Sequence, residues 1–167
     1  MALLTLQVNG VPRTANVPAG ATLLEFLHDG LELAGVRVGC EEGVCGACTV
    51  LVENQPVRSC MITAAACAGK RILTLEGLSR NGQLHPVQQA LLRHGALRCG
   101  FCTPGMILEA VALLEDASRP LTRRRLRRAI EGHVCRCGMQ ERILEAVEEA
   151  AERMGRLKPE RAREKEL

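Results

Sequence analysis

The chain has 167 residues and a formal net charge of +3, and 47% of its residues are hydrophobic. This length fits one ordinary domain or two small ones, and the hydrophobic content excludes wholesale disorder. The small net charge gives no support for a nucleic-acid partner, and no stretch is long and apolar enough to span a membrane. With two Phe and no Tyr or Trp, a small core needs another source of stability, and bound metal is a common one.

The amino terminus lacks the features of a secretion signal. Residues 1–7 contain no basic region and no small-residue cleavage site, so we expect a cytoplasmic protein. In that compartment thiols stay reduced, and the nine cysteines therefore favour metal binding over disulfides.

The first half of the chain has the pattern of a small sheet with one helix. Strand patterns occur at 4–8, 11–17, 49–52, about 57 (after a turn over 54–56) and 72–75. The Asn9-Gly10 pair between the first two strands favours a tight hairpin turn. Thr22 and Glu25 match a capping box, which predicts a helix that continues to about Gly30. This order of elements predicts an α+β fold for the first half.

The second half follows a polar, glycine-bearing segment and has helical patterns. Apolar residues recur at helical spacing over 86–95, 103–114, 122–130 and 141–154. Pro86 suits a first helical position, and Thr103-Pro104 has the pattern of an N-cap followed by a first helical residue. The charged segment after Arg156 is expected to fray. We therefore predict two domains, over 1–78 and 79–156, and a charged tail over 157–167.

Basic residues concentrate in the third predicted helix, at Arg123, Arg124, Arg125, Arg127 and Arg128. A solvated helix face is the expected role of these arginines, and docking to an acidic protein is the alternative. No aromatic residues lie between them, which argues against stacking on single-stranded bases.

A first group of cysteines lies between the predicted helix and the strands that follow it. Cys40, Cys45 and Cys48 have the spacing C-x4-C-x2-C, and Cys60 follows one strand, turn and strand later. This is the plant-type ferredoxin arrangement for a [2Fe–2S] cluster. The glycines that let such a loop wrap closely around a flat Fe₂S₂ unit are Gly39, Gly43 and Gly46. Zinc is the rival metal, but structural zinc sites favour paired C-x2-C knuckles.

A second group consists of Cys99 and Cys102, spaced C-x2-C, and Cys135 and Cys137, spaced C-x-C. Each pair adjoins a predicted helix start, where the positive end of the helix dipole favours an anionic cluster. By spacing alone this group suits zinc and iron–sulfur equally. The ninth cysteine, Cys67, is expected to be a small buried hydrophobic residue.

Longer motifs surround both groups of cysteines. Val38-Gly39-Cys40-Glu41-Glu42-Gly43-Val44-Cys45-Gly46-Ala47-Cys48 resembles the ferredoxin-loop signature of the small subunits of molybdenum hydroxylases. Cys99-Gly100-Phe101-Cys102-Thr103-Pro104-Gly105-Met106 resembles the second signature of that family. Three further segments are similar to its remaining landmarks: 76–78, 84–88 and 135–138. The family includes xanthine and carbon monoxide dehydrogenases, and this chain looks closest to the isoquinoline 1-oxidoreductase alpha-subunit type.

The resemblance implies a β-grasp ferredoxin-like domain followed by a four-helix domain, each with one [2Fe–2S] cluster. The implied ligands are Cys40, Cys45, Cys48 and Cys60 in the first domain, and Cys99, Cys102, Cys135 and Cys137 in the second. Such a chain is the non-catalytic subunit of an oxidoreductase. It relays electrons singly from a molybdopterin centre in a large catalytic subunit to an external acceptor. A flavin (FAD) or cytochrome subunit is the candidate acceptor, and neither it nor the molybdopterin is expected on this chain.

Two other functions stay open from the residues alone: a stand-alone ferredoxin-like carrier and a structural zinc module. The sequence has no catalytic acid–base pair, activated nucleophile or nucleotide-binding glycine loop, which agrees with a division of labour in which the chemistry happens on a partner. Many family members have Gln where this chain has Arg98, so Arg98 receives no role. His133, a lone histidine beside a predicted helix end, is expected to be structural.

Overall fold

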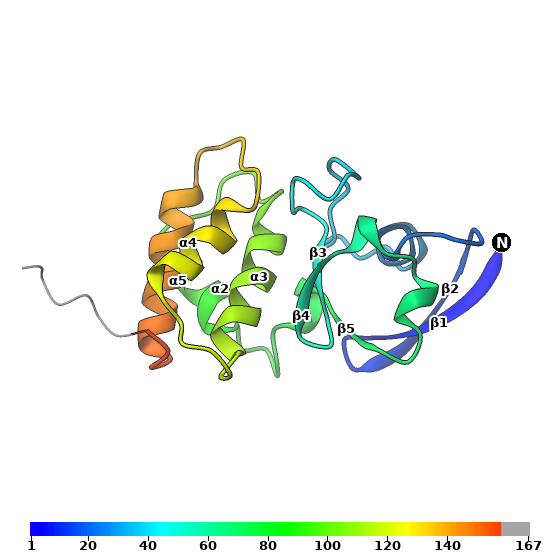
Figure 1. The fold of residues 1–167 in the computed structure, drawn as a ribbon, viewed down its shortest axis with the longest axis horizontal. Helices are drawn as coiled ribbons and strands as arrows, with labels where there is room; N and C mark the ends of the chain where they lie inside the picture. The colour runs from blue at the N-terminus through cyan, green and yellow to red at the C-terminus, as the bar shows by residue number, and fades with distance from the viewer. Residues whose placement is uncertain (158–167) are drawn as a thin grey trace, which may run out of the picture.

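The computed structural model describes residues 1–157 and shows two halves packed side by side (Figure 1). The first half contains a five-stranded mixed sheet with strands β1 (Ala2–Val8), β2 (Val11–Val17), β3 (Thr49–Val52), β4 (Gln55–Arg58) and β5 (Arg71–Leu73). The second half is helical, with α2 (Pro86–Arg93), α3 (Thr103–Glu115), α4 (Arg123–Glu131) and α5 (Gln140–Arg153). The predicted order, a sheet followed by helices, is therefore present.

The sheet has the strand order β2-β1-β5-β3-β4, in which β1 and β5 run parallel and the other pairs are antiparallel. The Asn9-Gly10 turn joins β1 to β2 as expected, and both residues have positive φ. The second hairpin turns earlier than predicted, at Glu53-Asn54, which also have positive φ. Pro56 lies within β4 instead of in the turn. Because β4 is at the edge of the sheet, the missing proline N–H is tolerated there.

The helix of the first half begins at the predicted capping box. Glu25 N–H donates to Thr22 Oγ1 at 3.1 Å, and the Glu25 carboxylate accepts from Thr22 N–H at 2.6 Å. The α-helical part, α1 (Leu23–Glu25), is short and continues as a π-helical turn (Phe26–Gly30). The apolar residues of both parts fill the core under the sheet: Leu23, Leu24, Phe26 and Leu27.

Helix α3 is the helix that faces the sheet, and it packs against β3 and β4 as well as against α2 and α4. It begins one residue earlier than predicted, because Cys102 is its N-cap and Thr103 is already helical. Helix α5 packs on α2 and α4, and Leu157 after it is buried in the same core. The chain therefore stays packed one residue beyond Arg156, where fraying was expected. The rest of the predicted tail, 158–167, lies outside the described residues.

The arginines of α4 contact acidic groups on neighbouring segments. Arg123 is 2.7 Å from Glu152 and Arg127 is 2.6 Å from Glu141, both across to α5. Arg125 also lies 3.8 Å from a carboxylate oxygen of Asp116. Within residues 1–157, Arg123, Arg125 and Arg127 thus form ion pairs, which the prediction of a solvated helix face did not include.

Three loops that carry cysteines lie on one side of the molecule, at the top of Figure 1. They are the segment before β3, the segment before α3 and the segment between α4 and α5. Within residues 1–157, no helix combines the length and apolar character that crossing a bilayer requires.

Candidate iron–sulfur sites

The first group of thiols comes together where the loop before β3 meets the end of β4. Cys60 sits in a short 3₁₀ turn (Ser59–Met61) directly after β4. Its Sγ is 3.4 Å from Sγ of Cys48, the last cysteine of the loop. The thiol of Cys45 lies near enough to Cys40 to lower its pKa, and Cys40 lies near enough to Cys60 to act on it electrostatically. The structure thus brings together all four residues that were predicted to share a cluster.

Backbone N–H groups of this loop point at sulfur. The amides of Cys45 and Glu42 lie 3.3 Å and 3.4 Å from Sγ of Cys40. Mainly through these two donors, the pKa of the Cys40 thiol falls to about 7. Burial instead raises the pKa of Cys60 to about 11. The loop therefore stabilises the thiolate form of Cys40, whereas burial favours the neutral thiol at Cys60.

Glycines permit the close approach of backbone and sulfur in this loop. Gly43 and Gly46 have φ of 75° and 77°, a conformation that side chains strain. Gly39 has ordinary φ, but a Cβ there would lie 2.6 Å from Sγ of Cys45. All three positions of the predicted cluster loop therefore favour glycine: Gly43 and Gly46 because of their positive φ, and Gly39 because a Cβ has no space there.

The second group of thiols lies at the amino-terminal ends of two helices. Sγ of Cys137 is 3.4 Å from Sγ of Cys99, and Cys102 is paired with Cys135. Cys102 is the N-cap of α3, and the N–H of Met139, the N-cap of α5, is 3.4 Å from Sγ of Cys135. Both helix dipoles therefore favour negative charge at this group. Burial raises the pKa of Cys102 to about 12, whereas the Phe101 N–H lowers the pKa of Cys99.

The donor sets fit binuclear clusters better than single metal ions. In each group the thiols form two pairs, as required when each of two irons takes two cysteines. A zinc ion needs its ligands to converge tetrahedrally on one point. The donor chemistry and the pairing therefore favour [2Fe–2S] clusters over zinc in both groups.

All nine cysteines are free thiols, and one of them belongs to neither group. Cys67 is 1% exposed and lies in the core of the first half, where burial raises its pKa. It is the small buried hydrophobic residue that the sequence predicted.

A hydrogen bond joins the two groups of thiols directly. The N–H of Val134, which precedes Cys135, donates to the carbonyl oxygen of Cys45 at 2.9 Å. Beside it, His133 is 1% exposed, and its Nδ1 lies 3.0 Å from the Ala129 carbonyl oxygen. Its burial, reinforced by the nearby Arg58, lowers its pKa and thus favours the neutral ring.

Four more residues surround this contact, and sequence reasoning did not find them. Arg58 on β4 pairs with Glu109 on α3, and it also donates to Thr49 on β3. Gly105 at the start of α3 touches the Gly46 carbonyl, so that a Cβ there would collide with it. Gly105 lies within the second signature and Thr49 directly follows Cys48, but local pattern does not indicate which partner each residue would meet.

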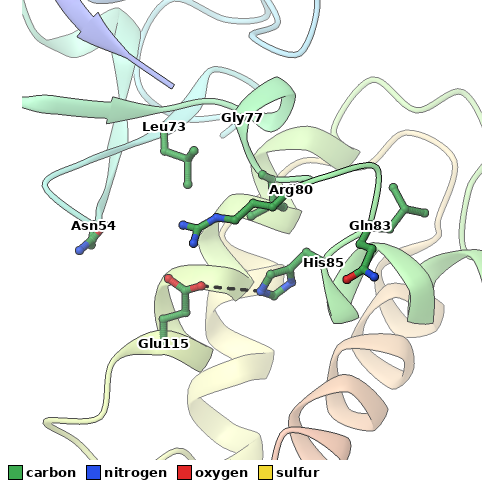
Figure 2. Close-up of a pocket in the computed structure, with 9 residues that line it drawn as sticks. Asn54, Leu73, Gly77, Arg80, Gln83, His85 and Glu115 are labelled. Atoms are coloured by element: carbon green, nitrogen blue, oxygen red, sulfur yellow. Dashed lines mark ion pairs between the residues drawn. The ribbon is translucent and has the colours of Figure 1, made fainter. Parts of the chain in front are cut away.

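A separate cavity of 290 Å³ lies at the other end of the contact between the two halves, where α3 ends (Figure 2). Arg80 and His85 reach it from the segment between the halves, and Glu115 reaches it from the end of α3. His85 Nε2 is 3.7 Å from the Glu115 carboxylate. No cysteine lines this cavity, so it is not part of either thiol group.

Comparison with known proteins covers both halves of the chain. Residues 6–72 match the 2Fe-2S iron-sulfur cluster binding domain, and residues 74–148 match a [2Fe-2S] binding domain. The beta subunit of the 6-hydroxypseudooxynicotine dehydrogenase complex of Paenarthrobacter nicotinovorans is 46% identical over 147 residues, which cover 88% of this chain and 92% of the relative. The xanthine dehydrogenase iron-sulfur-binding subunit of Escherichia coli O157:H7 is 43% identical, with coverage of 84% and 88%.

The fold matches that of a solved oxidoreductase subunit. A chain of quinoline 2-oxidoreductase from Pseudomonas putida 86 superposes with a TM-score of 0.82 at 38% identity. The match covers 93% of this chain and 98% of the other. The similarity therefore extends over both thiol groups and the contact between them.

Proposed function

Since the chain belongs to the iron–sulfur small subunits of the molybdenum hydroxylases, we propose that its eight paired cysteines hold two [2Fe–2S] clusters in series. The chain is thus the electron-carrying, non-catalytic subunit of a larger oxidoreductase. We assign Cys40, Cys45, Cys48 and Cys60 to a cluster in a β-grasp domain over 1–78. We assign Cys99, Cys102, Cys135 and Cys137 to a cluster in a four-helix domain over 79–156.

Each bound cluster supplies a redox centre that exchanges one electron at a time. The protein holds the thiolates, directs N–H groups at sulfur and buries part of each site. Cys48, Cys60 and Cys102 are buried, whereas Cys99 and Cys137 are exposed. The helical group therefore has an open edge, and the other group is the more enclosed of the two.

The observation that carries this proposal is the direct connection between the two groups. From Cys45 it runs through that residue's own carbonyl group, across the 2.9 Å hydrogen bond to Val134, and along one peptide unit to Cys135. A link of this kind gives electrons a short path through bonds between two redox centres, and it also stabilises the contact between the two halves.

The open edge of the helical group is the proposed docking face for the catalytic subunit. Large apolar side chains are exposed around it: Leu97 (41%), Phe101 (45%) and Val134 (60%). Exposed apolar groups that adjoin each other are typical of a protein interface. We propose that a large molybdopterin-binding subunit covers this edge, and that electrons leave from the plant-type loop to a flavin or cytochrome subunit. The named relatives are parts of dehydrogenases, which does not favour a stand-alone carrier.

Replacement of Cys45 by Ser in the purified complex tests the proposal. Cys45 belongs to the group from which electrons are proposed to leave, so we expect loss of one cluster signal and loss of turnover, while substrate still reduces the catalytic subunit. Cys67→Ala is the matched control, because this thiol belongs to neither group, and it should retain both clusters and turnover. Normal turnover and two intact cluster signals in Cys45→Ser would contradict the assignment.

A further inference from the structure

The ion pair between Arg58 and Glu109 lies across the contact between the two halves. Arg58 Nη1 is 2.9 Å from Glu109 Oε2, and the two side chains are only 23% and 18% exposed. Arg58 ends β4, two residues before Cys60, and Glu109 lies on α3, seven residues after Cys102. A partly buried pair of this kind is costly to break on one side, because the remaining charge loses its partner.

The guanidinium of Arg58 makes two more hydrogen bonds, and both reach segments that carry cysteines. Nη1 donates to Thr49 Oγ1 at 2.5 Å, directly after Cys48. Nη2 donates to the Gly132 carbonyl oxygen at 3.2 Å, three residues before Cys135. A single planar side chain therefore connects β3, β4, α3 and the loop after α4. Lysine lacks the fork of donors that this geometry uses.

The loop after α4 leads directly to the Val134–Cys45 hydrogen bond that joins the two thiol groups. Gly132, held by Arg58, is followed by His133 and then by Val134, whose N–H donates to the Cys45 carbonyl. The His133 ring is packed tightly, since a Cβ on Gly46 would lie 2.8 Å from its Cγ. A shift of Gly132 would therefore move both the ring and the Val134 N–H relative to Cys45.

We propose that Arg58 and Glu109 are positioning residues that hold the Val134–Cys45 hydrogen bond in place and thereby control electron passage between the two cysteine groups. They touch no cysteine sulfur, so they act through Gly132 and Thr49. This inference rests on the proposed function for its consequence, electron passage. The mechanical part, control of the Val134 N–H, does not depend on it.

The mechanical part is tested by amide hydrogen exchange at Val134 in the purified complex. In Arg58→Gln and Glu109→Gln, we expect exchange at Val134 to be about 5- to 150-fold faster, as follows from losing one buried hydrogen-bonding partner. Arg71→Gln is the matched control. It breaks an ion pair with Glu53 that is confined to the first half and is 76% and 42% exposed, so Val134 exchange should not change.

The electronic part is tested in the same variants by the rate of electron equilibration between the two clusters after rapid photochemical reduction. We expect this rate to fall in Arg58→Gln and Glu109→Gln, and to recover only in part in Arg58→Lys, which keeps the charge but not the fork. Arg71→Gln should equal the wild type. Glu109→Gln leaves the hydrogen bonds of Arg58 to Thr49 and Gly132 in place, so this variant stays informative if Arg58→Gln folds poorly.

Unchanged Val134 exchange in both Arg58→Gln and Glu109→Gln would overturn the proposal. Faster exchange at Val134 with an unchanged rate of electron equilibration would also overturn it, because the Val134–Cys45 hydrogen bond would then not control electron passage. Failure of the proposed function looks different: the wild-type complex itself would lack one or both cluster signals.

Discussion

At Gly46 the chain needs both a left-handed backbone and the absence of a side chain. Its φ is 77°, and a Cβ would lie 2.8 Å from Cγ of the buried His133 ring. From the sequence, this glycine was predicted only to help wrap the loop around a cluster. In the structure it also lets the two halves approach each other, so one residue serves the thiol group and the contact between the domains.

Comparison of Gly46→Ala with Gly69→Ala separates these two requirements. Gly69 has nearly the same φ, 74°, but open space where its Cβ would be. We expect Gly69→Ala to lower the free energy of unfolding by about 1–2 kcal/mol through backbone strain alone. Gly46→Ala should cost a further ~1–3 kcal/mol, because His133 must move. Chemical denaturation of both variants measures the difference, and equal costs would show that the His133 contact is not tight.

At the scale of single elements, α5 is tied to α2 through one carboxylate. Glu149 lies 2.5 Å from His94 Nε2, 2.8 Å from Arg93 and 3.1 Å from Arg153. These hydrogen bonds, that of His94 first, lower the pKa of Glu149 from 4.5 to about 2. The ionised carboxylate is thus favoured in the folded chain.

This depressed pKa gives a stability contribution with a defined pH range. It is fully present above the unfolded value of 4.5, and it is lost as the pH falls through about 2. Near pH 5 we expect Glu149→Gln to unfold at lower denaturant concentration than the wild type, and the two should converge toward pH 2. Glu145→Gln, an exposed position on the same helix, is the control. A gap between Glu149→Gln and wild type that stayed constant from pH 5 to pH 2 would contradict this pairing.

The elements were predictable where the signal is local. Asn9-Gly10 set the first hairpin, and the capping box at Thr22 set the start of α1. The second hairpin was misplaced because Pro56 usually marks a turn, whereas at a sheet edge it can remain in the strand. Arg123 was expected to face solvent, since the acidic residues that it meets on α5 are distant in sequence.

At the scale of the whole molecule, the spacing of eight cysteines is enough to indicate both thiol groups. Short ligand spacings are local, and the order of the motifs points to the family. The contact between the halves was not predictable in this way. Arg58 and Glu109 are 51 residues apart, and the Val134–Cys45 bond joins two loops that only folding brings together. These long-range contacts depend on how the sheet packs against α3. No local pattern in a single sequence indicates that packing.

In the assembled molecule the Val134–Cys45 hydrogen bond joins the two thiol groups, and the partly buried Arg58–Glu109 ion pair lies beside it. All of its proposed function depends on iron occupying both groups. Iron and acid-labile sulfide analysis of anaerobically purified protein, combined with electron paramagnetic resonance after reduction, tests this most directly. We predict about four irons and four sulfides per chain, with two distinct cluster signals. Zinc without iron, or colourless protein without a signal, would contradict the account.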